Sequence, residues 1–310
     1  MELLELSAGL ALLASLFAAL QAVSVEYGMS NGEFVDDRSP ALAAAVISIV
    51  VSVVVFWALL VVRDVSLAGI PAMKLLPFAV AGLGNPAAFR LLYFRSIDRI
   101  GARVSAAVVS ANPAVAAFLA LPLLGEQFTA LTAAGLVCIV VGAVVLQAAR
   151  AGDSDSDDLL LSELTGLELR DLAFPVSAMV LLGCSFVLVK IGLNGYGNTL
   201  VGTAVGQTAA LVGFLGLFAT SKRSRRRVRI RNRTALVAFT LAGAFVAANW
   251  LAWFSALQLG TVVTVVPLAN VYPLFIVAIS YALIREVPRS PRIIGGITII
   301  IVGASLMQLA

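Results

Sequence analysis

Long apolar runs alternate with short polar connections along the whole chain. A helix needs about 20 apolar residues to cross a hydrocarbon core ~30 Å thick, and ten of the runs are long enough. Their polar positions do not alternate with the period of two that barrel strands would show, so we expect helices that pair every backbone group internally. The sequence predicts an all-α integral membrane protein with ten transmembrane helices, at residues 3–24, 41–62, 74–94, 103–124, 129–149, 173–193, 198–220, 234–257, 262–284 and 291–310.

Composition supports a membrane protein and narrows its chemistry. Hydrophobic residues make up 61% of the chain and charged residues 12%, whereas a soluble domain is nearer half apolar and a quarter charged. The chain has no histidine, which excludes histidine metal sites and histidine-based catalysis. Cys138 and Cys184 lie within apolar runs and are expected to be small buried side chains, not a disulfide. We therefore expect a multi-pass plasma-membrane protein that is not an enzyme and needs no cofactor or metal.

The chain repeats one pattern after 160 residues. "PAVAAFLALPLLGE" begins at Pro113 and ends at Glu126, and "PLFIVAISYALIRE" begins at Pro273 and ends at Glu286. Each half holds five predicted helices, and because five is odd, the second half enters the membrane from the opposite side. The pattern predicts two inverted five-helix repeats, residues 1–150 and 173–310, joined by an acidic linker at 151–172.

Basic residues gather on one side of the predicted membrane domain. They lie in the connections after the odd-numbered helices, above all in the arginine-rich loop at 221–233, whereas the other side holds Arg63 and Lys74. The positive-inside rule then places that loop in the cytoplasm and both termini outside. We expect residues 222–233 to contact anionic lipid head groups, and not nucleic acid.

Four features recur in the same order in both halves: an aromatic pair, a proline, a glutamate and a glycine. They read Tyr93-Phe94, Pro113, Glu126 and Gly135 in the first half, and Trp253-Phe254, Pro273, Glu286 and Gly295 in the second. This set, with the run "LLGCSFVLVK" that ends at Lys190, resembles EamA-type members of the drug/metabolite transporter superfamily. The resemblance covers nearly the whole chain. It implies a ten-helix secondary transporter of a small organic solute or metabolite, working by alternating access.

The resemblance leaves several matters open. Members of that superfamily usually have both termini inside, the reverse of what the charge count predicts here. The chain has no phosphate-binding loop, so ATP is not expected to drive transport. A non-transporting membrane scaffold or receptor is the alternative function, and a homodimer is compatible with either.

Polar and aromatic residues within the predicted helices are the candidates for substrate binding. Pro113 and Pro273 are expected to kink their helices and to take part in gating, with freed backbone carbonyls facing a cavity; a packed kink without function is the alternative. For the neighbouring polar groups, hydrogen bonds between helices are the alternative, and for Arg90 it is an extended side chain that reaches the interface. The candidates are Asn85, Arg90, Asn112, Gln207, Asn249, Trp253, Asn270 and Tyr272, with Tyr93 and Trp250 as further aromatic walls.

Four charged residues near helix ends are candidates for ion coupling: Glu26, Glu126, Glu286 and Lys190. Without histidine, proton coupling would need one of these carboxylates. The alternative is that the carboxylates anchor helix ends at the interface and that the lysine extends to it. Two glycine pairs, Gly135 with Gly142 and Gly295 with Gly303, are expected to let helices pack closely.

Overall fold

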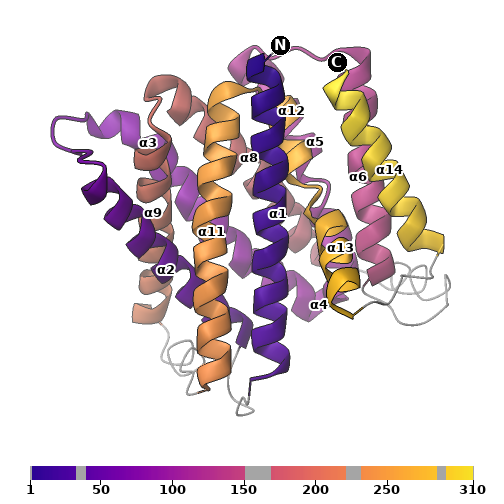
Figure 1. Ribbon diagram of the computed structural model, residues 1–310, viewed down its shortest axis with the longest axis horizontal. Helices are drawn as coiled ribbons and strands as arrows, with labels where there is room; N and C mark the ends of the chain where they lie inside the picture. Colours follow the sequence, from indigo (N-terminus) through magenta and orange to yellow (C-terminus); the bar gives the residue numbers. More distant parts are fainter. Residues whose placement is uncertain (1, 33–39, 151–168, 221–231, 285–290, 310) are drawn as a thin grey trace.

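The computed structural model describes residues 2–32, 40–150, 169–220, 232–284 and 291–309, and within these ranges all regular structure is helical. Figure 1 shows the helices side by side in a bundle, with both termini at one end, which we call the terminal end. The elements are α1 (Glu2–Ser30), α2 (Pro40–Val62), α3 (Ala72–Gly82), η1 (Leu83–Ala88), α4 (Phe89–Val109), α5 (Asn112–Leu124), α6 (Ala130–Arg150), α8 (Leu169–Gly195), α9 (Thr199–Thr220), α11 (Arg233–Leu259), α12 (Val262–Ala269), α13 (Tyr272–Ile284) and α14 (Pro291–Gln308).

These elements form ten apolar spans in the described part of the chain, which confirms the predicted fold class. Eight are long enough to cross a membrane, and the two shorter ones are Ala130–Leu146 and Pro291–Met307. The third span is Ala72–Gly101 and the fourth is Val104–Leu124. Gly101 joins them with a φ of 78°, a left-handed conformation that glycine adopts without a steric penalty. For this reason α4 contains the end of one span and the start of the next.

The third span is longer and less regular than the continuous helix predicted at 74–94. Asn85 has non-helical backbone angles, φ −132° and ψ 119°, in the middle of the span. Pro86 follows it and has no N–H to donate, so the helical hydrogen-bond ladder is interrupted here. The sequence predicted a continuous helix here, without a break at Asn85.

Pro113 and Pro273 lie where their spans are interrupted, and their part in gating stays a prediction. The fourth span ends one helix at Val109 and starts α5 at Asn112, and the ninth ends α12 at Ala269 and starts α13 at Tyr272. Each proline is therefore the second residue of a new helix, where its missing N–H would have had no helical partner in any case. The two breaks lie 160 residues apart, in agreement with the offset of the sequence repeat.

Glycines allow α6 and α14 to pack closely, although one of them is not the glycine expected. A Cβ added to Gly303 would lie 2.8 Å from the Gly135 carbonyl oxygen, and one added to Gly142 would lie 2.9 Å from that of Gly296. A Cβ on Gly295 would meet nothing within 4 Å. The pair on α14 is therefore Gly296 and Gly303, and Gly295 faces open space.

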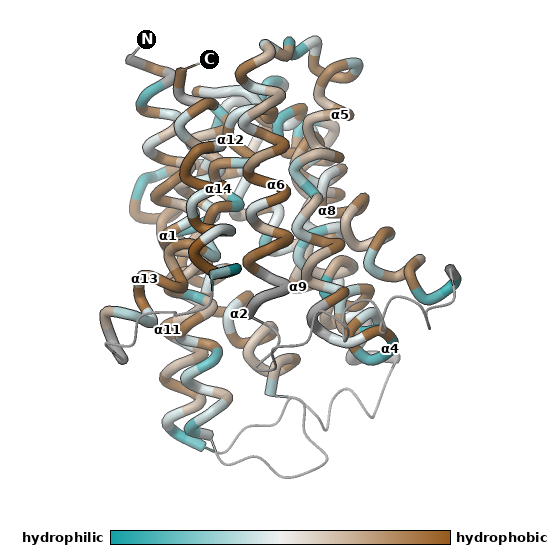
Figure 2. Tube along the Cα trace, turned by 90° about the vertical axis from the view of Figure 1, so that its right-hand side faces the viewer, coloured by the Kyte–Doolittle hydropathy of each residue, from teal (hydrophilic) through white to brown (hydrophobic). Residues whose placement is uncertain are grey.

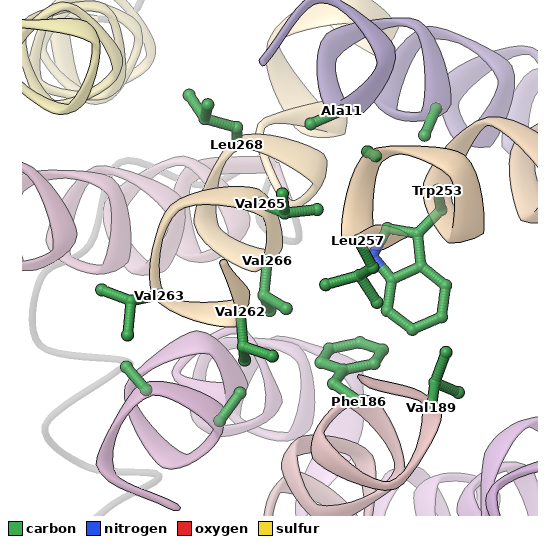
Figure 3. Close-up of a cluster of buried hydrophobic side chains, with 14 of the residues drawn as sticks. Ala11, Phe186, Val189, Trp253, Leu257, Val262, Val263, Val265, Val266 and Leu268 are labelled. Atoms are coloured by element: carbon green, nitrogen blue, oxygen red, sulfur yellow. The ribbon is translucent and has the colours of Figure 1, made fainter. Parts of the chain in front are cut away.

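Large apolar side chains cover the outside of the bundle, and small ones fill much of its inside. Figure 2 shows hydrophobic residues along the length of the helices, and Val54, Phe118 and Val137 are 63%, 72% and 60% exposed. Many buried positions are alanines, as expected where helices approach closely in lipid. A large cluster of buried apolar side chains includes the valines of α12 together with Leu257, Phe186 and Trp253 (Figure 3).

Candidate functional site

Two adjoining cavities, of about 270 Å³ and 230 Å³, lie beside the helix breaks. Phe89, Asn270 and Tyr272 line both, so we treat them as one chamber. The larger cavity is also lined by Tyr93, Ala106, Val109, Ser110, Asn112, Ala143, Leu182 and Pro273. The smaller is also lined by Ala18, Gln21, Ile49, Asn85, Pro86, Arg90, Phe186, Val246, Asn249, Trp250, Trp253 and Ala269.

Helices α4 and α11 supply the chamber walls from equivalent positions of the two repeats. Phe89 corresponds to Asn249, Arg90 to Trp250 and Tyr93 to Trp253 at the offset of 160, and all six line the chamber. The repeat therefore places its two copies of this helix on one shared space, while their side chains differ in chemistry.

The helix breaks bring polar side chains of both halves together. The Asn112 side-chain amide donates to the Val109 carbonyl oxygen at 2.9 Å, an oxygen that the Pro113 nitrogen could not satisfy. The same amide approaches Asn270 Oδ1 at 3.4 Å, and Asn270 donates to the Val266 carbonyl oxygen at 2.8 Å. Asn112 Oδ1 is buried and has no hydrogen-bond partner among the described residues, so the chamber contains an acceptor that a solute or water could use.

Aromatic rings from α4, α8 and α11 line the chamber. The Phe186 and Trp253 ring centroids are 4.9 Å apart, and those of Trp250 and Trp253 are 5.9 Å apart in an edge-to-face arrangement. On α4, the ring centroids of Phe89 and Tyr93 are 5.6 Å apart in a stacked arrangement. Such rings supply a large apolar surface with a fixed shape, as binding pockets for organic molecules often do.

Seven of the eight predicted binding residues line the chamber, and their role in binding stays a prediction. Within it, Asn249 donates to the Ala14 carbonyl oxygen at 2.6 Å and so also joins α11 to α1. Gln207 lies elsewhere: it is fully buried between α9 and α2, where Ser52 Oγ donates to its Oε1 at 3.2 Å. For Gln207 the structure therefore gives the alternative, a hydrogen bond between helices.

Glu126 and Lys190 lie outside the chamber, at the turn between α11 and α12. The carboxylate of Glu126 accepts hydrogen bonds from the backbone N–H groups of Val262 at 2.8 Å and Val263 at 2.9 Å. Lys190 donates to the carbonyl oxygens of Leu257 at 2.6 Å and Gly260 at 2.7 Å. Each charge complements the helix end that it touches, because helix N-termini attract anions and C-termini attract cations. Glu126 thereby joins the first half of the chain to the second.

The other two coupling candidates are not part of this arrangement. Glu26 is exposed near the end of α1, and Glu286 lies outside the described residues. The arginine-rich loop at 221–233 lies outside them as well, apart from its last two residues, of which Arg233 starts α11.

Several lining residues were not among the candidates, notably Gln21, Phe89, Ser110 and Phe186. The repeat itself carried a signal for two of them. Phe89 is the counterpart of Asn249, and Ser110 is the counterpart of Asn270. Applying the offset of 160 to each candidate would have found both, whereas Gln21 and Phe186 reach the chamber through packing that no local pattern indicates.

Comparison with known families gives a match to each half of the chain. The model of the EamA-like transporter family matches residues 6–147 and again residues 172–308. One solved crystal structure has a similar fold, with a TM-score of 0.75 at 17% sequence identity over 98% of this chain and 96% of its own. No curated protein matches the sequence.

Proposed function

Because the chain belongs to the EamA-like transporter family, within the drug/metabolite transporter superfamily, we propose that it is a secondary transporter of a small organic solute. The observation that carries this proposal is the chamber between the inverted halves, at the breaks before Asn112 and Tyr272. Interrupted helices at the interface of inverted repeats are where secondary transporters bind their solutes. A scaffold or receptor would have no need for two such breaks at equivalent positions.

Alternating access requires that the chamber be closed at one end at a time. The α12 segment and its counterpart in α4, 160 residues earlier, differ in how far they are buried. At the terminal end, Val262, Val265 and Val266 of α12 are all 0% exposed. The equivalent segment of α4 is less buried: Ala106 lines the larger cavity and is only partly covered. We therefore assign the structure to a conformation that is closed at the terminal end, with the chamber extending toward the opposite end.

Glu126 is proposed to stabilise this closed end. Its two hydrogen bonds to the start of α12 connect the α5–α6 connection of one half to the helix that closes the chamber in the other. These bonds must break if α12 moves away to open the terminal end. Opening of the terminal end would therefore be controlled by Glu126, which belongs to the other repeat.

The distribution of basic residues indicates which end of the bundle faces the cytoplasm. If the arginine-rich loop is cytoplasmic, the terminal end faces outward from the plasma membrane. The conformation described here would then open toward the cytoplasm.

The test is solute flux in proteoliposomes that contain the purified protein. A panel of radiolabelled amino acids, monosaccharides, nucleosides, carboxylic acids and amines is screened by counterflow. We expect at least one solute to exchange, and Ser110→Trp, which fills the chamber, to abolish the exchange. The matched control is Ser66→Trp, in the exposed connection between α2 and α3, which should exchange normally. No flux above protein-free vesicles for any solute would favour the scaffold or receptor instead.

A further inference from the structure

Arg90 is the single charged side chain among the described residues that line the chamber. It lies in the first turn of α4, one turn beyond the break at Asn85, and is partly buried. The next arginine of the same helix, Arg95, is exposed. Arg90 thus lines the chamber in the interior of the third span instead of reaching the solvent-exposed end of its helix.

No described carboxylate neutralises Arg90. An ion pair of the described residues joins Arg99 and Asp171 at 2.7 Å, and neither residue lines the chamber. A charge inside a membrane protein is costly and generally marks a pathway for ions or solutes. An arginine in a cavity without an anionic partner is therefore a candidate binding group for an anion that enters from outside the protein.

Helix ends of both signs lie at the chamber. The half-helices α5 and α13 begin at Asn112 and Tyr272, and both of these residues line it. The N-terminal end of a helix carries a partial positive charge and favours anions. The preceding helices end at the same breaks, at Val109 and Ala269, which also line the chamber, and their C-terminal ends carry the opposite partial charge. The helix ends therefore offset one another, and the guanidinium supplies the positive charge of the chamber.

The repeat counterpart of Arg90 is an aromatic ring, and it indicates the chemistry of the part of the solute that lies away from the guanidinium. Trp250 lies at the equivalent position of α11, in edge-to-face contact with Trp253, and Phe186 packs on Trp253 at 4.9 Å. A flat apolar group suits such a wall. Taken together as one chamber, the cavities of about 270 Å³ and 230 Å³ fall in the lower half of the range of about 300–1,000 Å³ that is usual for ligand pockets, which suits a small organic solute.

We propose that the chamber binds a small organic monoanion with a flat apolar body, such as an aromatic carboxylate. Its carboxylate pairs with the Arg90 guanidinium, whose planar fork can donate two parallel hydrogen bonds to it. Its ring lies against Trp250, Trp253 and Phe186. A single cation in the lining favours a monoanion over a phosphate ester, which would carry two charges at neutral pH. This assignment of the substrate class rests on the proposed transport function.

Matched pairs of acids and their neutral amides test the proposal. Equilibrium binding to the purified protein in lipid nanodiscs is measured at pH 7 for benzoate and benzamide, 3-phenylpropionate and 3-phenylpropanamide, and indole-3-acetate and indole-3-acetamide. We expect at least one acid to bind about thirtyfold or more tightly than its amide, since unpairing one member of a buried charge pair typically weakens binding at least that much. Arg90→Gln should remove the preference, Arg90→Lys should keep part of it, and the control Arg95→Gln should leave it unchanged.

The outcomes separate this inference from the transport function. Equal binding of acid and amide in all three pairs, binding of none of the six compounds, or a preference that survives in Arg90→Gln would each overturn the anion assignment. Arg90→Lys guards against a folding defect, because it keeps the charge and the length of the side chain. The counterflow panel is independent: exchange of a neutral or cationic solute there would leave the transport function in place while contradicting the anion assignment.

Discussion

At the scale of single residues, two charged side chains form hydrogen bonds with unpaired backbone groups at helix ends. Lys190 donates to the last carbonyl oxygens of α11, and Glu126 accepts from the first N–H groups of α12. Partly buried charges without partners would be unfavourable, but backbone groups at helix ends offer partners of the right sign. Both residues were candidates for ion coupling, and their contacts now suggest that they hold the closed end of the chamber in place.

Glu126→Ala should lower the thermal stability of the protein in nanodiscs. Two hydrogen bonds from backbone N–H groups to a carboxylate are lost, and we expect a loss of about 1–2 kcal/mol. Glu126→Gln should lose less, because its amide oxygen can still accept one of the two bonds. Glu26→Ala is the matched control at an exposed site and should change stability by about 0.5 kcal/mol or less. Equal melting temperatures for all three variants would show that the contact contributes nothing.

At the scale of elements, the breaks and the glycine contacts both follow the repeat. The breaks are 160 residues apart and place Asn112 near Asn270. The α6–α14 contact uses two glycines from each helix. Small residues of this kind allow the backbones to approach, which is a main source of helix association in lipid.

Gly303→Ala and Gly295→Ala form a matched pair on one helix. A Cβ at position 303 would lie 2.8 Å from both the Gly135 carbonyl oxygen and Cys138 Cβ, while one at position 295 would meet nothing within 4 Å. Gly303→Ala should therefore destabilise the protein by about 1–3 kcal/mol through overpacking. Gly295→Ala should leave stability unchanged or raise it by up to ~1 kcal/mol. Similar melting temperatures for the two variants would contradict the close contact between α6 and α14.

Hydrophobic runs and the 160-residue offset were enough to predict the ten spans and the inverted halves. They were not enough to predict the form of each irregularity or the break at Asn85. A proline in an apolar run is equally compatible with a kink and with a new helix, and the choice depends on whether side chains such as Asn112 can satisfy the freed carbonyl groups. Gln207 illustrates the same limit for the site, because a polar residue inside a span can face a chamber or another helix, and only packing decides which.

At the scale of the whole molecule, two similar halves occupy different states. Most of the α12 segment is buried at the terminal end, whereas Ala106 in its counterpart in α4 is only partly covered and lines the chamber. Exchange of these two states would carry the chamber from one side of the membrane to the other. The two halves carry different side chains at equivalent positions such as Arg90 and Trp250. The lining of the chamber is therefore asymmetric, even though the proposed exchange of states treats the two halves as equivalent.

The most direct test of this account is the accessibility of the chamber from each side of the membrane. A single cysteine replaces Ser110 in a Cys138→Ala, Cys184→Ala background, and a membrane-impermeant thiol reagent is added to intact cells or to inside-out vesicles. Ser66→Cys and Asn31→Cys are exposed reference sites at the two ends of the bundle. We expect the first to react in cells and the second in vesicles, which would establish that the terminal end is outside.

With those references, we expect Ser110→Cys to react readily in vesicles and slowly in cells. Adding Glu126→Ala should raise the rate in cells about five- to thirtyfold, the factor that corresponds to about 1–2 kcal/mol, and should lower the rate in vesicles as the population shifts. Opposite changes in the two rates are specific to alternating access. A rate in cells that Glu126→Ala leaves unchanged, or two rates that rise together as in an open pore, would contradict it.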